Sequence, residues 1–209
     1  MALVKYNNNS ISAITTAGQL ASGSQVLIKE QTASSSSTVS FVDGSSDVVL
    51  DSTYPIYKFV WINAHPSQQS GDGEEFQFNM STDGGSSYAV TKTSTYFVAT
   101  HAESDSSSSL GYSSSHDLAQ STSSQRVSVD NKGDADSSNS GSMFLFSPSS
   151  TTFVKHFIVT NNYMHSGPTS INTFVAGYGN TTSAIDAVKF EFSAGTIESG
   201  TIKLYGIKD

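Results

Sequence analysis

Apolar and polar residues alternate in many short runs along the chain, and this period of two predicts β-strands. In the clearest run, EFQFNMS at residues 75–81, the apolar side chains of Phe76, Phe78 and Met80 fall on one face. Windows with apolar residues at the spacing of a helix are nearly absent from the sequence. We therefore expect a protein built almost entirely of strands.

The segments with a strand pattern are residues 25–30, 38–42, 48–50, 56–64, 75–81, 95–100, 126–129, 141–146, 153–160, 173–178, 187–193 and 200–207. Turns rich in Gly, Ser and Asp separate these segments. Short strands with such turns are typical of an antiparallel sandwich or barrel. We predict an all-β fold, an antiparallel β-sandwich of the jelly-roll type over residues 23–209, with an extended N-terminal arm over residues 1–22.

The composition agrees with one β-rich domain and excludes several classes of protein. The chain has 209 residues, of which 36% are hydrophobic and 13% are charged, and it has no cysteine. Without cysteine there are no disulfides and no thiolate metal sites. The net charge of −8 argues against nucleic-acid binding, because an acidic surface repels phosphate groups. No apolar run approaches the roughly 18 residues of a membrane span, and the N-terminal sequence lacks a signal-peptide core, so we expect neither membrane insertion nor export.

The polar stretch THAESDSSSSLGYSSSHDLAQ, residues 100–120, holds the residue types of a hydrolase triad or a zinc site. His101 and His116 lie there among serines, with Glu103, Asp105 and Asp117 close in sequence. The chain has no nucleophile elbow of the form GxSxG. We expect a long surface loop in which His101 ends a strand and His116 is solvated, and we predict no catalytic residue and no cofactor.

Acidic clusters are the next candidates for chemistry. Asp130, Asp134 and Asp136 in DNKGDAD are hard oxygen ligands of the type that calcium prefers, but the segment lacks the glycine position and the closing glutamate of an EF-hand. They are weak candidates for a metal site. These aspartates and the acidic segment 72–75 are also the candidate carboxylates for a glycan hydrolase, which needs two of them facing a sugar. Both clusters lie in glycine-rich segments, where aspartate is favoured for turn formation alone.

Two further sets of residues are candidates for packing or recognition. His156 lies in the apolar strand FVKHFIV, which predicts a core or subunit-interface histidine. Tyr88, Tyr112 and Tyr163 fall in predicted turns or loops and are candidates for surface recognition of sugars or proteins. Trp61, in the longest apolar strand, is expected in the core.

Several phrases of the sequence carry a family resemblance. They are LIKEQTASSSSTVSFVDGSSDVVLDSTYPIYKFVWINAHPS, FQFNMSTDGGSSY, LFSPSSTTFVKHFIV, FVAGYGNTTSAIDAVKFEFSAG and GTIKLYGIKD. Together they resemble a family of small virion structural proteins of tailed bacteriophages, common among phages of marine bacteria. The resemblance covers nearly the whole chain. It implies a virion component with a β-sandwich fold that acts as a multimer, and it brings no catalytic motif.

We therefore expect a non-enzymatic structural protein located in the virion, first of all a capsid decoration (cement) protein. Its expected partners are copies of itself, as a trimer, and the major capsid protein or another virion protein. The apolar residues of the arm are expected to contact a neighbour, and they are Leu3, Val4, Tyr6, Ile11 and Ile14. The alternative is a tail or head-fibre module that binds host-surface carbohydrate, and the third is a glycan hydrolase.

Overall fold

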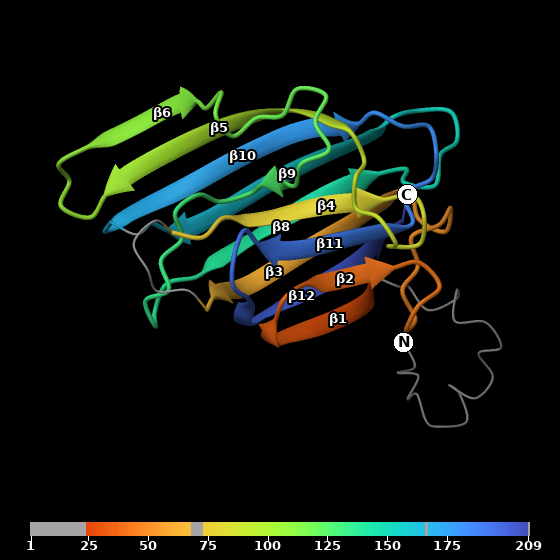
Figure 1. Ribbon diagram of the computed structural model, residues 1–209, viewed down its shortest axis with the longest axis horizontal. Coiled ribbons are helices and arrows are strands. Elements are labelled where there is room, and N and C mark those ends of the chain that lie inside the picture. The colour runs from red at the N-terminus through yellow and green to blue at the C-terminus, as the bar shows by residue number, and fades with distance from the viewer. Residues whose placement is uncertain (1–23, 68–72, 166, 209) are drawn as a thin grey trace, which may run out of the picture.

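The computed structural model describes residues 24–67, 73–165 and 167–208, and these fold into two antiparallel β-sheets without a helix (Figure 1). The larger sheet has the strand order β1-β12-β3-β8-β9-β10-β5-β6, and the smaller sheet has the order β2-β11-β4-β7. The strands are β1 (Gln25–Ser36), β2 (Val39–Val42), β3 (Ile56–Pro66), β4 (Phe76–Ser81), β5 (Lys92–Ala102), β6 (Ser108–Tyr112), β7 (Gln125–Arg126), β8 (Asn139–Phe146), β9 (Lys155–Met164), β10 (Thr169–Gly179), β11 (Ala187–Phe192) and β12 (Ile197–Ile207). The all-β, antiparallel prediction is confirmed. The predicted arm, with Leu3, Val4, Tyr6, Ile11 and Ile14, lies outside the described residues.

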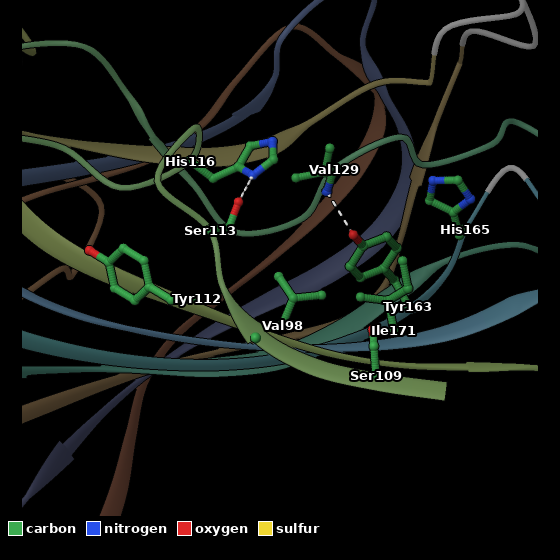
Figure 2. Close-up of a pocket in the computed structure, with 10 residues that line it drawn as sticks. Val98, Ser109, Tyr112, Ser113, His116, Val129, Tyr163, His165 and Ile171 are labelled. Atoms are coloured by element: carbon green, nitrogen blue, oxygen red, sulfur yellow. Dashed lines mark hydrogen bonds between the residues drawn. The ribbon is translucent and has the colours of Figure 1, made fainter. Parts of the chain in front are cut away.

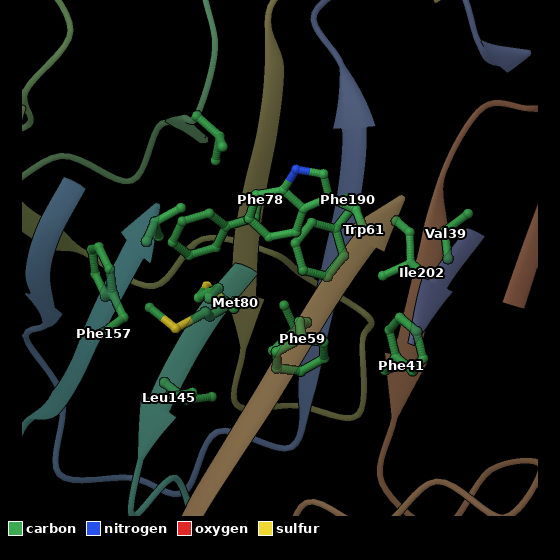
Figure 3. Close-up of a cluster of buried hydrophobic side chains, with 14 of the residues drawn as sticks. Val39, Phe41, Phe59, Trp61, Phe78, Met80, Leu145, Phe157, Phe190 and Ile202 are labelled. Carbon is green, nitrogen blue, oxygen red and sulfur yellow. The ribbon is translucent and has the colours of Figure 1, made fainter. Parts of the chain in front are cut away.

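The two sheets pack face to face through aromatic side chains (Figure 3). The Phe59 ring of β3 lies 5.4 Å from the Phe41 ring of β2 and 5.4 Å from the Phe190 ring of β11. The Trp61 ring contacts Phe76 of β4 at 5.6 Å. These rings are fully buried, which confirms the core prediction for Trp61. Because aromatic side chains bury a large apolar area each, this cluster supplies much of the driving force for folding.

Two predicted elements differ from the structure. Residues 48–50 form no strand; they follow the turn at residues 43–47, the Leu50 backbone N–H donates to Asp43 Oδ1 at 2.8 Å, and Val48 and Leu50 are buried. The polar stretch expected to be a loop contains β6, which pairs with β5 at the edge of the larger sheet. Its sequence SSLGY lacks alternation, so the strand is specified by its pairing partner and not by a pattern of its own.

The prediction of a core histidine at His156 is wrong. In β9 the buried position belongs to Lys155, and His156 points outward with its ring 6.2 Å from that of Tyr178. The Lys155 ammonium donates to the backbone carbonyl of Phe153 at 2.7 Å and of Thr181 at 3.4 Å. A lysine is tolerated at a core position when its aliphatic stem packs inside and its terminal donors find acceptors.

The smaller sheet covers only part of the larger one. In Figure 1 its strands lie over β12, β3 and β8, and Phe78 of β4 also reaches β9, where its ring centroid lies 5.2 Å from that of Phe157. A segment that is irregular apart from the short β7 crosses β10 and β5. The described part of the chain has no helix with the length and hydrophobicity needed to cross a bilayer. The uncovered end of the larger sheet is where a cavity forms.

Candidate functional site

Residues 113–131 cover the inner face of the larger sheet where the smaller sheet ends. The Thr173 hydroxyl of β10 donates to the Val127 carbonyl at 2.6 Å, and the Ser94 hydroxyl of β5 donates to Gln125 Oε1 at 2.6 Å. Gln125 and Val127 are fully buried. Polar inward residues of the larger sheet thus hold in place a segment that is irregular apart from β7, because buried polar groups need hydrogen-bond partners.

A cavity of about 300 Å³ lies between this segment and the sheet (Figure 2). Its lining residues are Val98, Ser109, Gly111, Tyr112, Ser113, His116, Val129, Tyr163, His165 and Ile171. The aliphatic side chains come from β5, β10 and the covering segment, and the polar groups are hydroxyls and imidazoles. No aspartate, glutamate, lysine or arginine is among these lining residues. The cavity therefore suits a small group without formal charge.

The polar centre of the cavity is a serine–histidine pair. Ser113 Oγ lies 2.5 Å from His116 Nδ1, and the His116 ring packs 5.3 Å from the Tyr96 ring (ring centroids). Burial lowers the pKa of His116, and the nearby Arg126 lowers it further, so the imidazole is held in its neutral form. The expectation of a solvated His116 is thus wrong.

The pair does not make a triad. Among the described residues, no carboxylate forms an ion pair with His116; the neighbouring Asp117 accepts a hydrogen bond from the Tyr112 hydroxyl. His101 ends β5, as expected, and its Nε2 lies 3.2 Å from Asp105 Oδ1 at the exposed surface. Without a group that orients the imidazole, the pair can hold a ligand by hydrogen bonds but lacks the arrangement that activates a serine.

The three tyrosines predicted for surface recognition lie in different environments. Tyr163 is buried, with 3% of its surface exposed, and its hydroxyl accepts a hydrogen bond from the Val129 backbone N–H at 3.0 Å, so its prediction as a surface residue is wrong. Tyr112 is half exposed and packs edge-on against Phe97 at 5.4 Å. Tyr88 is partly buried beneath the ammonium of Lys189. The structure brings Tyr112 and Tyr163 to the same cavity and leaves Tyr88 elsewhere.

The weak metal candidates do not converge. Asp130 Oδ2 lies 3.4 Å from His165 Nε2, and Asp134 Oδ2 lies 2.7 Å from Lys132 Nζ. Within the described ranges, no three His, Asp or Glu side chains are grouped as metal ligands. The aspartates Asp130, Asp134 and Asp136 are therefore separate turn residues, two of which are paired with a nearby base.

The sequence interpretation did not predict that two lysines are buried side by side in the larger sheet. Lys92 of β5 and Lys155 of β9 are fully buried, and both stand opposite Gly179 of β10, so the three residues form one row across the sheet. The alternation of Lys92 with the inward Ser94 and Tyr96 was a usable signal for its burial.

Comparisons with protein-family models, with curated proteins and with solved structures return no match.

Proposed function

We propose that the protein is a non-enzymatic structural protein of a tailed-phage virion that assembles with copies of itself, as a trimer, and decorates the capsid surface. The observation that carries this proposal is the outer face of the larger sheet. The resemblance to small virion structural proteins supports a role in a virion, and the outer face supplies a physical reason for assembly.

The outward positions of five adjacent strands carry no charged side chain, and at their border the ammonium of Lys58 of β3 lies 5.2 Å from the centre of the Phe144 ring. The outward positions of β6, β5, β10, β9 and β8 hold no aspartate, glutamate, lysine or arginine, although the whole chain has 18 acidic and 10 basic residues. Several large apolar side chains on this face are 45% to 75% exposed, and they are Phe97, Leu110, Tyr112, Ile158 and Phe174. Depletion of charge together with exposed aromatic residues is typical of the centre of a protein–protein interface.

These side chains are neighbours across the sheet. Tyr112 stands opposite Phe97, and Phe97 stands opposite Phe174, so three aromatic residues form one row over β6, β5 and β10. Ile158 of β9 stands opposite Phe144 of β8 in an adjoining row. A continuous apolar surface of this kind is stabilised by contact with a partner, since each of these side chains loses contact with water there.

The proposal also specifies the type of sandwich and the partners of the N-terminal arm. The sandwich is of the jelly-roll type, and residues 1–22 act as an arm that contacts a neighbouring subunit or the major capsid protein through its apolar residues. Decoration proteins cover a lattice, which agrees with a broad, uncharged sheet face as the assembly surface. The proposed location is the virion, with no nucleic-acid or membrane partner.

Copy number tests the placement on the head. Purified particles of the phage that encodes this chain are digested, and the chain is quantified by mass spectrometry against the major capsid protein. A ratio near one to one, or one per few capsid subunits, is expected for a decoration protein. A ratio of a few per cent or less contradicts decoration and favours a tail, collar or fibre component.

The cavity supports a second candidate, adhesion to host-surface carbohydrate. Its hydroxyls and the neutral imidazole of His116 suit hydroxyl-rich ligands, and its aliphatic walls suit the apolar face of a sugar ring. Binding of host glycans by the wild-type protein, lost in His116→Phe, would favour this role. Glycan hydrolysis has no support from the cavity, since none of its described lining residues is a carboxylate.

A further inference from the structure

The buried amine of Lys92 in β5 and the side-chain amide of Asn79 in β4 are in direct contact. Lys92 Nζ lies 2.6 Å from Asn79 Oδ1, and its second acceptor is the Val90 carbonyl at 2.7 Å. Lys92 is fully buried, and Asn79 is 3% exposed. Burial lowers the pKa of Lys92 to about 8, because desolvation disfavours the ammonium form. A substantial fraction of the side chain is therefore neutral amine, which is a nucleophile, under mildly basic conditions.

The surroundings of Asn79 fix the orientation of its carboxamide beside Lys92. Its Nδ2 donates to the Thr122 carbonyl at 3.1 Å and to Ser124 Oγ at 3.5 Å, which leaves Oδ1 on the side of Lys92. The Met80 backbone N–H donates to the same Oδ1 at 2.9 Å. A donor at this oxygen stabilises the negative charge that develops there when a nucleophile adds to the carbonyl carbon.

The nitrogen that would depart also has a polar neighbour. The Ser124 hydroxyl, which accepts from Asn79 Nδ2, donates to Glu191 Oε1 at 3.1 Å. The Glu191 carboxylate is itself held by the Lys189 ammonium at 2.8 Å. The hydroxyl thus lies beside Nδ2 with its proton directed to Glu191, and rotation about its Cβ–Oγ bond turns that proton toward the departing nitrogen.

From this constellation we infer that Lys92 and Asn79 form an intramolecular isopeptide bond in the folded protein. The lone pair of the neutral Lys92 Nζ attacks Asn79 Cγ, the Nζ–Cγ bond forms, and the Cγ–Nδ2 bond breaks. The departing nitrogen gains the proton that the attacking nitrogen loses, and it leaves as ammonia. The step needs no oxidant, reductant or cofactor.

The bond would join β4 of the smaller sheet to β5 of the larger sheet. A chain without cysteine has no disulfide for this purpose, and an amide cross-link resists reduction. Lys155 is the internal comparison, because it is equally buried but contacts only backbone carbonyls, which are not electrophiles of this kind. The inference concerns the chemistry of the folded chain and is independent of the proposed role in a virion.

Mass spectrometry of the full-length purified protein tests the inference. The intact wild-type chain is expected to be lighter than its sequence by one ammonia molecule. Trypsin cleaves after lysine and arginine, so an unmodified chain yields Phe59–Lys92 and Thr93–Arg126. An acylated Lys92 resists trypsin, and a single peptide Phe59–Arg126, lighter by one ammonia, is expected in their place.

Variants distinguish formation of this isopeptide bond from other reactions that release ammonia. Lys92→Arg and Asn79→Ala are expected to have the full sequence mass, and the matched control Lys155→Met is expected to keep the loss. Ser124→Ala is expected to convert more slowly; an equal rate would remove the hydroxyl from the proposed proton route. The wild-type protein is also measured after prolonged incubation at mildly basic pH. If it then has its full sequence mass and trypsin cleaves normally after Lys92, the inference is overturned. This result does not depend on whether any variant folds.

Discussion

At the scale of the residue, Lys155 shows how neighbours decide which side chain is buried. Val154, His156 and Ile158 could have formed the inner face of β9 as well as Lys155 and Phe157, because both sets alternate. The carbonyls of Phe153 and Thr181 accept the Lys155 ammonium, and this local satisfaction settles the register. The sequence alone therefore predicts the strand but not its inner face, since both faces alternate and one of the two acceptors, the Thr181 carbonyl, comes from beyond the next strand of the chain.

Lys155 also gives the protein a dependence of stability on pH. Burial lowers its pKa below the ordinary value of 10.5 in the folded state. Between the two pKa values the unfolded chain binds more protons, so the free energy of unfolding rises with pH in this window. We expect a smaller rise in Lys155→Met than in the wild type, measured by urea unfolding at about pH 7 and about pH 10, because a free Lys92 amine, whose pKa burial also lowers, contributes a rise of its own in this window. The surface variant Lys132→Met is the control, and a rise in Lys155→Met equal to that of the wild type would contradict the assignment.

At the scale of the element, a chain of buried polar groups links three strands of the larger sheet. Trp61 Nε1 of β3 donates to Asn161 Oδ1 of β9 at 2.7 Å, and Asn161 Nδ2 donates to Asn139 Oδ1 of β8 at 3.2 Å. Asn139 Nδ2 then donates to the Ala64 carbonyl at 3.3 Å. Because the chain spans β3, β8 and β9, it fixes their relative register as well as satisfying its own polar atoms.

Breaking this chain is expected to destabilise the protein. Asn161→Leu leaves the Trp61 N–H and Asn139 Oδ1 without their buried partner, at a cost of about 1–3 kcal/mol for each group. Chemical denaturation measures the loss. The same change at the next residue, Asn162→Leu, lies on the outward face of β9, where water can replace the hydrogen bonds that Asn162 Nδ2 donates to Ser170 Oγ and the Ile171 carbonyl, so we expect a smaller loss, of about 0.5–1 kcal/mol. Equal effects at the two positions would show that the buried hydrogen bonds are not the cause.

Asn161, a member of this polar chain, is also where the sequence interpretation ended the strand too early. The strand predicted over residues 153–160 ends before Asn161, whereas β9 continues to Met164 with Asn161 and Tyr163 facing inward. Strands with clean alternation were predicted nearly to the residue, as for β4 and β11. The cavity escaped the sequence interpretation because its aliphatic walls, Val98, Val129 and Ile171, lie far apart in the chain and meet only through tertiary packing.

At the scale of the whole molecule, the larger sheet formed by the described residues is open: each of its two edge strands is paired on one side only, and the outward positions of five of its strands hold no charged side chain. β6 and β1 are the two edge strands. Leu110, on β6, is 75% exposed, and the β6 sequence carries none of the lysine or proline residues that often protect an edge. An edge and a face of this kind are a hazard for a monomer in isolation, but they are suited to a subunit whose neighbours cover them.

The outer face is therefore expected to be the surface that holds the oligomer together. Phe97 and Phe174 stand opposite each other at its centre, and an aspartate at either position would place a charge in the apolar contact, at a cost of about 2 kcal/mol or more. We expect light scattering after size-exclusion chromatography to give the mass of a trimer for the wild type and of a monomer for Phe97→Asp combined with Phe174→Asp. Phe153→Asp is the matched control, because Phe153 is 70% exposed but lies in the turn before β9, so this variant should remain trimeric. A wild type that stays monomeric at high concentration, or a double variant as trimeric as the wild type, would show that assembly does not use this face.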